Sequence, residues 1–266
     1  MQTIALIAGN GTYPLVFAKA AKKAGVRIIA VGIKEETNPE LKLYVEKIFW
    51  ISAGQLKKLI QILQSEKIEK AVMAGQINHK LLFSDIILDS ELRALLFKLK
   101  DKKTDTILSG IAQRLGELGI ELIDSTTFIK DYLPEPGVLT KTKPSKEQLE
   151  DVEFGLKIAK AIAGLDIGQT VVVKDKVVLS IEAIEGTDEA IARANLYCKG
   201  GAVVVKVSKP DQDMRFDIPL IGKQTIQTLI KEDAALLAVE SGKTLFLDQE
   251  YVLDQADEHG IVIVAI

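Results

Sequence analysis

The sequence has little of what marks secreted, membrane-spanning or nucleic-acid-binding proteins. A single cysteine, Cys198, in 266 residues excludes an internal disulfide framework and fits a reducing cytoplasm. The N-terminus lacks the charged start and long apolar centre of a signal peptide, and no apolar run approaches the roughly 20 residues of a membrane helix. The net charge is -3 and no basic run is interleaved with aromatics, so we expect no nucleic-acid partner. These absences predict a soluble, cytoplasmic protein.

Several kinds of catalytic centre are excluded in the same way. The chain has only two histidines, so a His-rich zinc site is excluded. Cys198 has no evident histidine partner, and no serine nucleophile motif is visible. Metal-assisted hydrolysis is the reaction class that these absences leave as the better hypothesis.

The abundant residues predict an α/β protein with a large core. Hydrophobic residues make up 47% of the chain and charged residues 27%. The first half alternates continuous apolar runs such as TIALIA and VRIIAVGI with amphipathic stretches such as QLKKLIQILQSEKI, which predicts a parallel sheet covered by helices. The proline-rich stretch LPEPGVLTKTKPS then marks a linker. We place the boundary between the domains 1–135 and 136–266 there, and expect the second domain to be mixed α+β with more antiparallel character.

The first polar turn, IALIAGNGTYP, resembles a dinucleotide fingerprint with one glycine missing. Gly9 and Gly11 supply the first two glycines of G-x-G-x-x-G, but Pro14 stands where the third is needed for close helix packing. Glu35 and Glu36 lie where an acid that binds ribose is expected. An NAD-dependent oxidoreductase is therefore one alternative. A plain structural turn, or a turn whose amides receive a phosphate or sugar, fits the residues better.

A second turn, AGQINHK, follows another predicted strand. Ligands of open α/β sheets bind at the carboxyl ends of the strands, and Gln76 and Asn78 could hydrogen-bond a polar ligand there. The alternative is an ordinary loop. His79 is expected to be a solvated surface residue.

An acidic cluster, IEAIEGTDEAI, lies in the second half. Its acids are Glu182, Glu185, Asp188 and Glu189. Thr187 or Asp188 can cap the next helix, which explains part of the pattern. Glu185 ends a predicted strand just before a glycine, and a carboxylate directed at a helix N-terminus suits a hard cation or a hydrated phosphate.

The segment MRFDIPLIGKQT carries an arginine and a carboxylate in a loop bounded by proline and glycine. Arg215 and Asp217 flank one residue and would point to the same side of an extended chain. A surface ion pair is the simple reading. The alternative is phosphoryl transfer, in which the arginine stabilises phosphate charge and the carboxylate holds Mg²⁺ or orients water. Together the polar turns of both halves suggest a cleft between two domains.

These motifs also resemble a known family. The ordered set LIAGNG, AGQI, LDIGQTVVV, IEAIEGTDEAI and VVVKVSKPDQDMRFDIPLIG is similar to the Mg²⁺-dependent UDP-2,3-diacylglucosamine diphosphatases of lipid A synthesis, of the two-domain type. The resemblance runs from residue 3 to the C-terminus, and LDIGQ, EGTD and R-x-D-x-P-x-x-G are its specific parts. It implies a Rossmann-like first domain, a distinct second domain, and hydrolysis of the pyrophosphate to UMP and 2,3-diacylglucosamine 1-phosphate, with Mg²⁺ (or Mn²⁺) as cofactor.

The resemblance also implies roles for individual residues. Asp217 matches the catalytic aspartate and would bind the metal or position water, with Glu185 or Asp188 as a second acidic contributor. Arg215 and Lys206 would neutralise the pyrophosphate. The expected substrate-binding positions are Gly9, Asn10, Gly11, Gly75, Gln76, Gln169, Gly186, Thr187 and Lys206.

The lipid part of such a substrate needs an apolar groove. Residues 81–99, LLFSDIILDSELRALLFKL, are the richest candidate, and the alternative is a helix that packs into the core. We also expect peripheral contact with the inner membrane surface and a homodimer, because symmetric dimers are common. A non-catalytic nucleotide-sugar-binding protein is the remaining alternative function.

Overall fold

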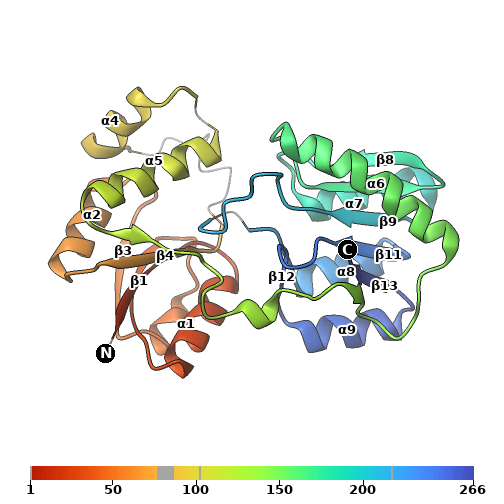
Figure 1. Cartoon of the computed structure of the whole chain (residues 1–266), viewed down its shortest axis with the longest axis horizontal. Coiled ribbons are helices and arrows are strands. Elements are labelled where there is room, and N and C mark those ends of the chain that lie inside the picture. Colours follow the sequence, from red (N-terminus) through yellow and green to blue (C-terminus); the bar gives the residue numbers. More distant parts are fainter. Residues whose placement is uncertain (1, 77–86, 102, 217) are drawn as a thin grey trace. The chain divides into compact units, whose positions relative to one another are not determined.

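The computed structural model describes residues 2–76, 87–101, 103–216 and 218–266, which form two compact units. The first unit is Met1–Lys130 together with Asp213–Asp217, and the second is Asp131–Gln212 together with Ile218–Ile266. The segment Asp213–Asp217 lies far along the sequence, in the range that we assigned to the second domain, and the structure packs it with the first unit. Figure 1 follows the chain by colour.

The first unit has the alternating strands and helices that the sequence predicts. Its elements are β1 (Thr3–Ala8), α1 (Tyr13–Lys23), β2 (Arg27–Ile33), the 3-10 helix η1 (Pro39–Leu43), β3 (Lys47–Ile51), α2 (Leu56–Ser65), β4 (Lys70–Ala74), α4 (Ser90–Lys98), α5 (Thr104–Glu117) and β5 (Glu121–Leu122). The 3-10 helix η2 (Lys130–Tyr132) spans the boundary between the two units. All five strands are parallel, in the order β3-β2-β1-β4-β5, which confirms the predicted parallel sheet.

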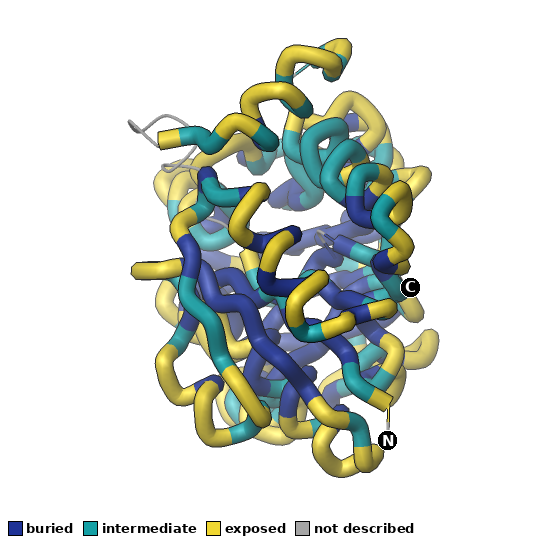
Figure 2. Tube along the Cα trace, turned by 90° about the vertical axis from the view of Figure 1, so that its left-hand side faces the viewer, coloured by how far each residue is buried: buried dark blue, intermediate teal, exposed yellow. Residues whose placement is uncertain are grey.

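Helices cover both faces of this sheet, which is why its strands are apolar on both sides. Alternate residues of β2 such as Ile29 and Val31 pack with α2, α4 and α5 in one core cluster. Helix α1 buries Phe17 and Ala18, and Figure 1 shows it on the opposite face from α4 and α5. The strand traces are buried along most of their length in Figure 2, while the outward turns of the helices are exposed.

The second unit is built around a six-stranded mixed sheet. Its elements are β6 (Gly137–Val138), α6 (Lys146–Gly164), β7 (Thr170–Lys174), β8 (Val177–Ile181), α7 (Thr187–Cys198), β9 (Val203–Lys206), β10 (Leu220–Ile221), α8 (Lys223–Lys231), β11 (Leu236–Val239), β12 (Leu245–Phe246), α9 (Gln249–Glu258) and β13 (Val262–Ala265). The strand order is β6-β13-β11-β9-β7-β8, and β10 pairs with β12 in a separate two-stranded sheet.

The antiparallel character that we predicted for the second domain is confined to part of this sheet. Strands β6, β7 and β8 pair antiparallel, whereas β9, β11 and β13 are parallel and are connected through α8 and α9. The second unit is therefore closer to α/β than the predicted α+β. Alternate residues serve the two faces: Val203 and Val205 pack on α6, and Val204 packs with α7, α8 and α9.

The predicted hairpin around KDK is confirmed. Asp175 and Lys176 both have positive φ, as a two-residue turn between antiparallel strands requires. Asp151 on α6 accepts hydrogen bonds from both turn amides, at 2.9 and 2.6 Å. Across the part of the chain that the structure describes, no helix is long and apolar enough to cross a membrane.

Candidate functional site

The two glycine turns of the first unit meet at the carboxyl edge of its sheet. Strands β1 and β4 are neighbours, and the loops after them are joined where Asn10 N donates to Gln76 O at 2.6 Å and Gln76 N donates to Asn10 O at 3.3 Å. The strand order reverses between β1 and β4, which is where open α/β sheets bind ligands. The structure therefore brings together Asn10 and Gln76, two of the predicted binding residues, with exposed side chains.

Close backbone approach explains the glycines of this edge. A Cβ at Gly9 would lie 2.4 Å from Gln76 O, and one at Gly75 would lie 2.4 Å from Asn10 O. Pro14, which replaces the third glycine of the fingerprint, packs against Gly75. Gly11 has open space around it, so close approach does not require a glycine there. Its φ of +89° does, because other residues rarely adopt this conformation.

The segment with the R-x-D motif is attached to the first unit at Met214 and Phe216. Ser125, in the loop after β5, donates from N and Oγ to Met214 O at 3.0 and 2.8 Å. Phe216 is 4% exposed and belongs to the core cluster of the first unit. Ser125 O in turn accepts from the buried Tyr13 hydroxyl at 2.7 Å, and burial raises the pKa of Tyr13 and keeps this donor protonated.

Arg215 is held by a carboxylate that we did not select from the sequence. Its Nε lies 2.9 Å from Asp213 Oδ1 and its Nη2 lies 2.6 Å from Asp213 Oδ2, a bidentate pair. The hydrogen bonds of Arg215 lower the pKa of Asp213, and the Arg215 side chain stays 40% exposed. Arg215 is thus fixed in position while it remains accessible to an anion. Asp217, the predicted catalytic residue, lies outside the described residues, as do Asn78 and His79.

A second polar edge lies in the second unit, where β7 begins, β9 ends and α7 starts. Lys206 follows Val204 on one face of β9 and is only 9% exposed. Its Nζ donates to Thr187 Oγ1 at 2.9 Å and to Leu220 O at 3.0 Å. Thr187 also donates to Glu182 Oε1 at 2.9 Å, so a buried ammonium and a carboxylate share one hydroxyl.

Two buried oxygens of this cluster have no hydrogen-bond partner among the described residues. They are Gln169 Oε1 and Asp188 Oδ1. Gln169 N donates to Glu182 Oε2 at 3.2 Å, so Gln169 is tied to the same cluster. Burial raises the pKa of Asp188, against the opposing effects of a hydrogen bond with Thr228 and the charge of Lys206. Buried oxygens without a partner are costly unless a bound group or an ordered water completes their hydrogen bonding.

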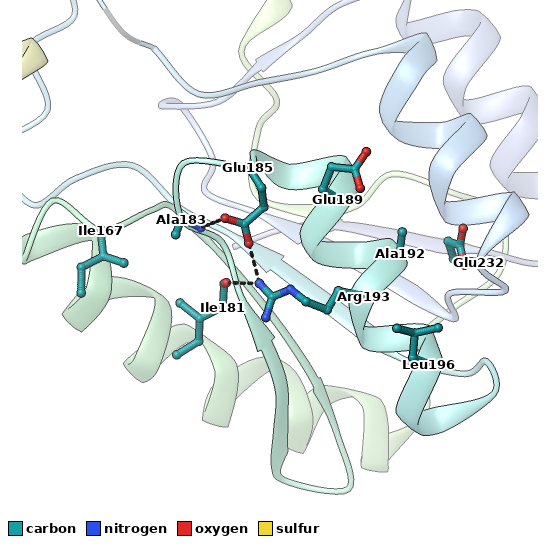
Figure 3. Close-up of a pocket in the computed structure, with 9 residues that line it drawn as sticks. All are labelled: Ile167, Ile181, Ala183, Glu185, Glu189, Ala192, Arg193, Leu196 and Glu232. Atoms are coloured by element: carbon teal, nitrogen blue, oxygen red, sulfur yellow. Dashed lines mark hydrogen bonds and ion pairs between the residues drawn. The ribbon is translucent and has the colours of Figure 1, made fainter. Parts of the chain in front are cut away.

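Gly186 and Glu185 have structural roles beside this cluster. Gly186 has a φ of +91° directly before α7. The sequence placed Glu185 at a strand end, but β8 ends at Ile181. Glu185 pairs with Arg193 and accepts from Ala183 N, while Arg193 donates to Ile181 O, and Figure 3 shows these contacts in an open, mostly apolar hollow. This ion pair ties the loop to the edge strand and engages the predicted metal-binding carboxylate.

The fit of a magnesium ion can be judged from these donors. Mg²⁺ prefers carboxylate, carbonyl and water oxygens. Within the described residues, no group of three or more His, Cys, Asp or Glu could hold a metal. Asp188 Oδ1 and Gln169 Oε1 have the right chemistry, since both are hard oxygens with no hydrogen-bond partner among the residues that the structure describes, whereas Glu185 is engaged by Arg193. Two hard oxygens are therefore available among the described residues, and these residues form no complete ligand set.

Glu240, at the end of β11, is a neighbouring group that the sequence reading missed. Its carboxylate pairs with Lys160 and accepts from Ser208 N and Oγ at 2.9 and 2.7 Å. Burial alone would raise the pKa of Glu240, but the hydrogen bonds from Lys160 and Ser208 outweigh it and lower this pKa to about 2.

Glu240→Gln is expected to lower the free energy of unfolding at pH 7 by about 1–2 kcal/mol, after allowance for solvent screening. Because the folded pKa lies below the ordinary value of 4.5, the stabilisation is present above pH 4.5 and is lost as the pH falls towards 2. Urea titrations from pH 7 to pH 3 should show wild type and variant converging. A constant difference across this range would contradict the assignment, and the exposed Glu153→Gln is the control.

Sequence reasoning could have found some of the missed residues. Ser208 and Glu240 follow buried apolar strands, which is the signal that led to Gln76. Ser125 gave no such signal, because its role depends on a contact with Met214 across 89 positions of sequence. Asp213 gave none either, although its partner Arg215 is only two residues away.

Comparisons with known proteins agree along nearly the whole chain. A family model described as the LpxI N-terminal domain matches residues 3–132, and one described as the LpxI C-terminal domain matches residues 135–264. A relative from Caulobacter vibrioides, the UDP-2,3-diacylglucosamine pyrophosphatase LpxI, is 29% identical over 100% of this chain and 98% of its own length.

Solved structures give only distant likenesses. An ADP complex of N5-carboxyaminoimidazole ribonucleotide synthetase is 18% identical with a TM-score of 0.30, over 72% of this chain and 34% of that one. A UDP-glucose-4-epimerase from Stenotrophomonas maltophila is 10% identical with a TM-score of 0.27, over 44% of this chain and 34% of that one. The chain thus spans about a third of these proteins, and likenesses at this level carry no argument.

Proposed function

We propose a function from the premise that this chain belongs to the LpxI family, whose two domain models together match residues 3–132 and 135–264. The protein hydrolyses the pyrophosphate of UDP-2,3-diacylglucosamine and releases UMP and 2,3-diacylglucosamine 1-phosphate, a step of lipid A biosynthesis. The observation that carries the proposal is the full-length match to a relative that is a UDP-2,3-diacylglucosamine pyrophosphatase.

The first unit is proposed to be Rossmann-like and to bind polar parts of the substrate. Its strand order and the joined turns at Asn10 and Gln76 support this role. Exposed backbone and amide groups at such an edge suit phosphate and sugar oxygens. Arg215, held by Asp213 in the same unit, is proposed to neutralise phosphate charge.

The second unit is proposed to contribute the Lys206 cluster. Hydrolysis forms a bond from a water oxygen to one phosphorus and breaks the bond from that phosphorus to the bridging oxygen, which leaves as part of the second phosphate. The water proton must be accepted, and the charge on the leaving oxygen must be stabilised. The Lys206 ammonium suits the second task. Asp188, whose Oδ1 has no partner among the described residues, suits positioning of the water or of a metal.

A bound Mg²⁺ would withdraw charge from the pyrophosphate oxygens. Asp188 and Gln169 are the described residues proposed to hold it, and Asp217 remains the sequence-based prediction for its main ligand or for orienting water. Mn²⁺ is proposed to substitute, since it accepts the same hard oxygens. A homodimer also remains a prediction, which light scattering checks.

The residue assignment is tested by UMP release from purified protein. We expect release with Mg²⁺ or Mn²⁺, none with EDTA, and a loss of about a thousandfold or more in Asp217→Asn. Arg215→Ala should lower turnover about a hundredfold, because removing one fixed charge stabiliser has this effect in other enzymes. Arg27→Ala, which removes an exposed arginine of the same unit, is the control. Wild-type turnover in both Asp217→Asn and Arg215→Ala would contradict the assignment.

A further inference from the structure

Helix α4 presents two different faces. Leu92 is buried, and Leu95 and Leu96 pack partly against the core of the first unit. The opposite face carries Phe97, whose exposed fraction is 92%, and the exposed Lys98. A helix that already buries leucines on one side therefore places its largest side chain outside the core.

This outward placement is fixed by contacts at the start of the helix. Asp89 caps α4 by accepting from Leu92 N at 2.9 Å, and it also accepts from Lys57 N, on α2, at 2.6 Å. Glu91 pairs with Arg114 on α5 at 2.6 Å. These bonds set the rotation of α4 about its axis, so Phe97 cannot turn inward without breaking them. Ile87, just before the cap, is 88% exposed as well.

Positive charge is concentrated next to this aromatic side chain. Residues 92–103 contain five basic side chains and one acidic one, although the whole chain has a net charge of -3. Of the basic residues, Arg93, Lys98, Lys100 and Lys103 are exposed. An anionic surface would be repelled by the protein as a whole and attracted by this patch, so the charge distribution orients any such contact.

We propose that the basic patch at the end of α4, defined as Phe97 with Lys98 and the following Lys100, docks on an anionic phospholipid surface. Phe97 enters the headgroup region, and the lysines meet the lipid phosphates while their methylene stems lie along the apolar layer. The inference deepens the proposed function and rests on it, because a two-chain lipid substrate resides in a bilayer. It also gives residues 87–99 a role: Leu92 and its neighbours are core, and Phe97 faces outward. The rest of the predicted acyl groove, 81–86, lies outside the described residues.

The chemistry of the patch favours lipid over nucleic acid. Lysines beside an aromatic ring suit single-stranded nucleic acid also, because bases stack on such rings. Ile87, exposed before the start of the same helix, is an aliphatic side chain that cannot stack on bases and that an apolar layer would stabilise. A nucleic-acid contact is retained as a distinguishable outcome of the test.

The test is co-sedimentation of the full chain with phosphatidylcholine vesicles that contain or lack phosphatidylglycerol. We expect binding that requires phosphatidylglycerol and weakens with salt. Phe97→Ser should lower the partition coefficient about tenfold, and Lys98→Glu/Lys100→Glu should lower it about fivefold for each lysine. Tyr197→Ser is the control for an exposed aromatic of the second unit, since Tyr197 is 72% exposed.

A charge-matched control comes from α1. Lys22→Glu/Lys23→Glu makes the same change of net charge at the end of another helix, and this variant should bind vesicles as wild type does. Equal binding by wild type, Phe97→Ser and Lys98→Glu/Lys100→Glu would overturn the proposal. The proposal would also be overturned if the wild-type protein bound an RNA oligonucleotide but no vesicles, and if these same variants lost the RNA binding.

Activity separates this proposal from the proposed function. With substrate in detergent micelles, Phe97→Ser should release UMP at the wild-type rate, and with substrate in vesicles it should be slower. If the protein releases no UMP but binds phosphatidylglycerol vesicles, and Phe97→Ser weakens that binding, the docking proposal stands and the proposed function is contradicted. If the protein releases UMP and Phe97→Ser binds vesicles as wild type does, the proposed function stands and the docking proposal is contradicted.

Discussion

Lys206→Met is expected to lower UMP release about a hundredfold or more and to destabilise the protein by about 3 kcal/mol. Lys206 is 9% exposed, and its ammonium donates to Thr187 Oγ1 and Leu220 O. Methionine fills similar volume without the charge, so the packing around β9 is retained. The cost arises because Asp188 and Glu182 then lie in a partly buried cluster without their cation.

Three further variants give this prediction its controls. The double variant Lys206→Met/Asp188→Asn should recover part of the lost stability but no activity, because the two charges are coupled. Lys174→Met removes a half-buried lysine at the other end of β7, whose Nζ donates to Gly200 O at 2.8 Å, and should keep wild-type turnover. Lys206→Arg keeps the positive charge but moves it, so its turnover shows whether the position of the charge matters. Wild-type turnover by a folded Lys206→Met would remove Lys206 from the mechanism.

Asp188→Asn is expected to raise the stability of the protein at pH 7 while it lowers turnover about a hundredfold. Burial raises the pKa of Asp188, so the ionised carboxylate is less favourable in the folded chain than in the unfolded one. Stability therefore falls as the pH rises above the ordinary value of 3.8, and asparagine escapes this loss. The gain should vanish as the pH falls below 3.8. A residue that costs stability and is retained is typical of a functional site.

Thermal unfolding of wild type and Asp188→Asn from pH 8 to pH 3, beside UMP release, measures both effects. Glu189→Gln is the matched control, since Glu189 is an exposed acid in the same first turn of α7. It should leave both stability and turnover nearly unchanged. A destabilised Asp188→Asn with normal turnover would show that Asp188 acts only as a helix-terminus residue.

Much of the fold follows from local patterns. The run TIALIA forms a strand buried on both faces, and KDK forms the predicted hairpin turn. Alternation of valines along β9 gives the two faces of the second sheet. These features depend on neighbours in the sequence, where periodicity and turn chemistry act directly.

The arrangement of the site depends on contacts that no local pattern encodes. Phe216 belongs to the core of the first unit although it follows β9 of the second. Arg215 is paired with Asp213, a carboxylate that the motif did not single out. Strand β8 ends at Ile181, before Glu185, because side chains occupy the backbone groups at its end. Arg193 donates to Ile181 O, and Glu185 accepts from Ala183 N.

The acidic cluster shows the same limit at the level of single residues. Four acids lie within eight positions, and spacing does not separate their roles. In the structure Glu182 accepts a hydrogen bond from Thr187, and Glu185 forms an ion pair with Arg193. Asp188 lies close enough to Lys206 for the charge of the lysine to lower the pKa of the aspartate, against the effect of burial. Burial distinguishes them, because Asp188 alone of the four has a buried oxygen without a partner among the described residues.

The most direct test of the account is identification of the products formed from UDP-2,3-diacylglucosamine by the purified protein with Mg²⁺. We expect UMP and 2,3-diacylglucosamine 1-phosphate in equal amounts by mass spectrometry. Release of UDP and free diacylglucosamine would show cleavage at the sugar instead of the pyrophosphate. That result, or no turnover in protein that binds the substrate, would contradict the proposed function.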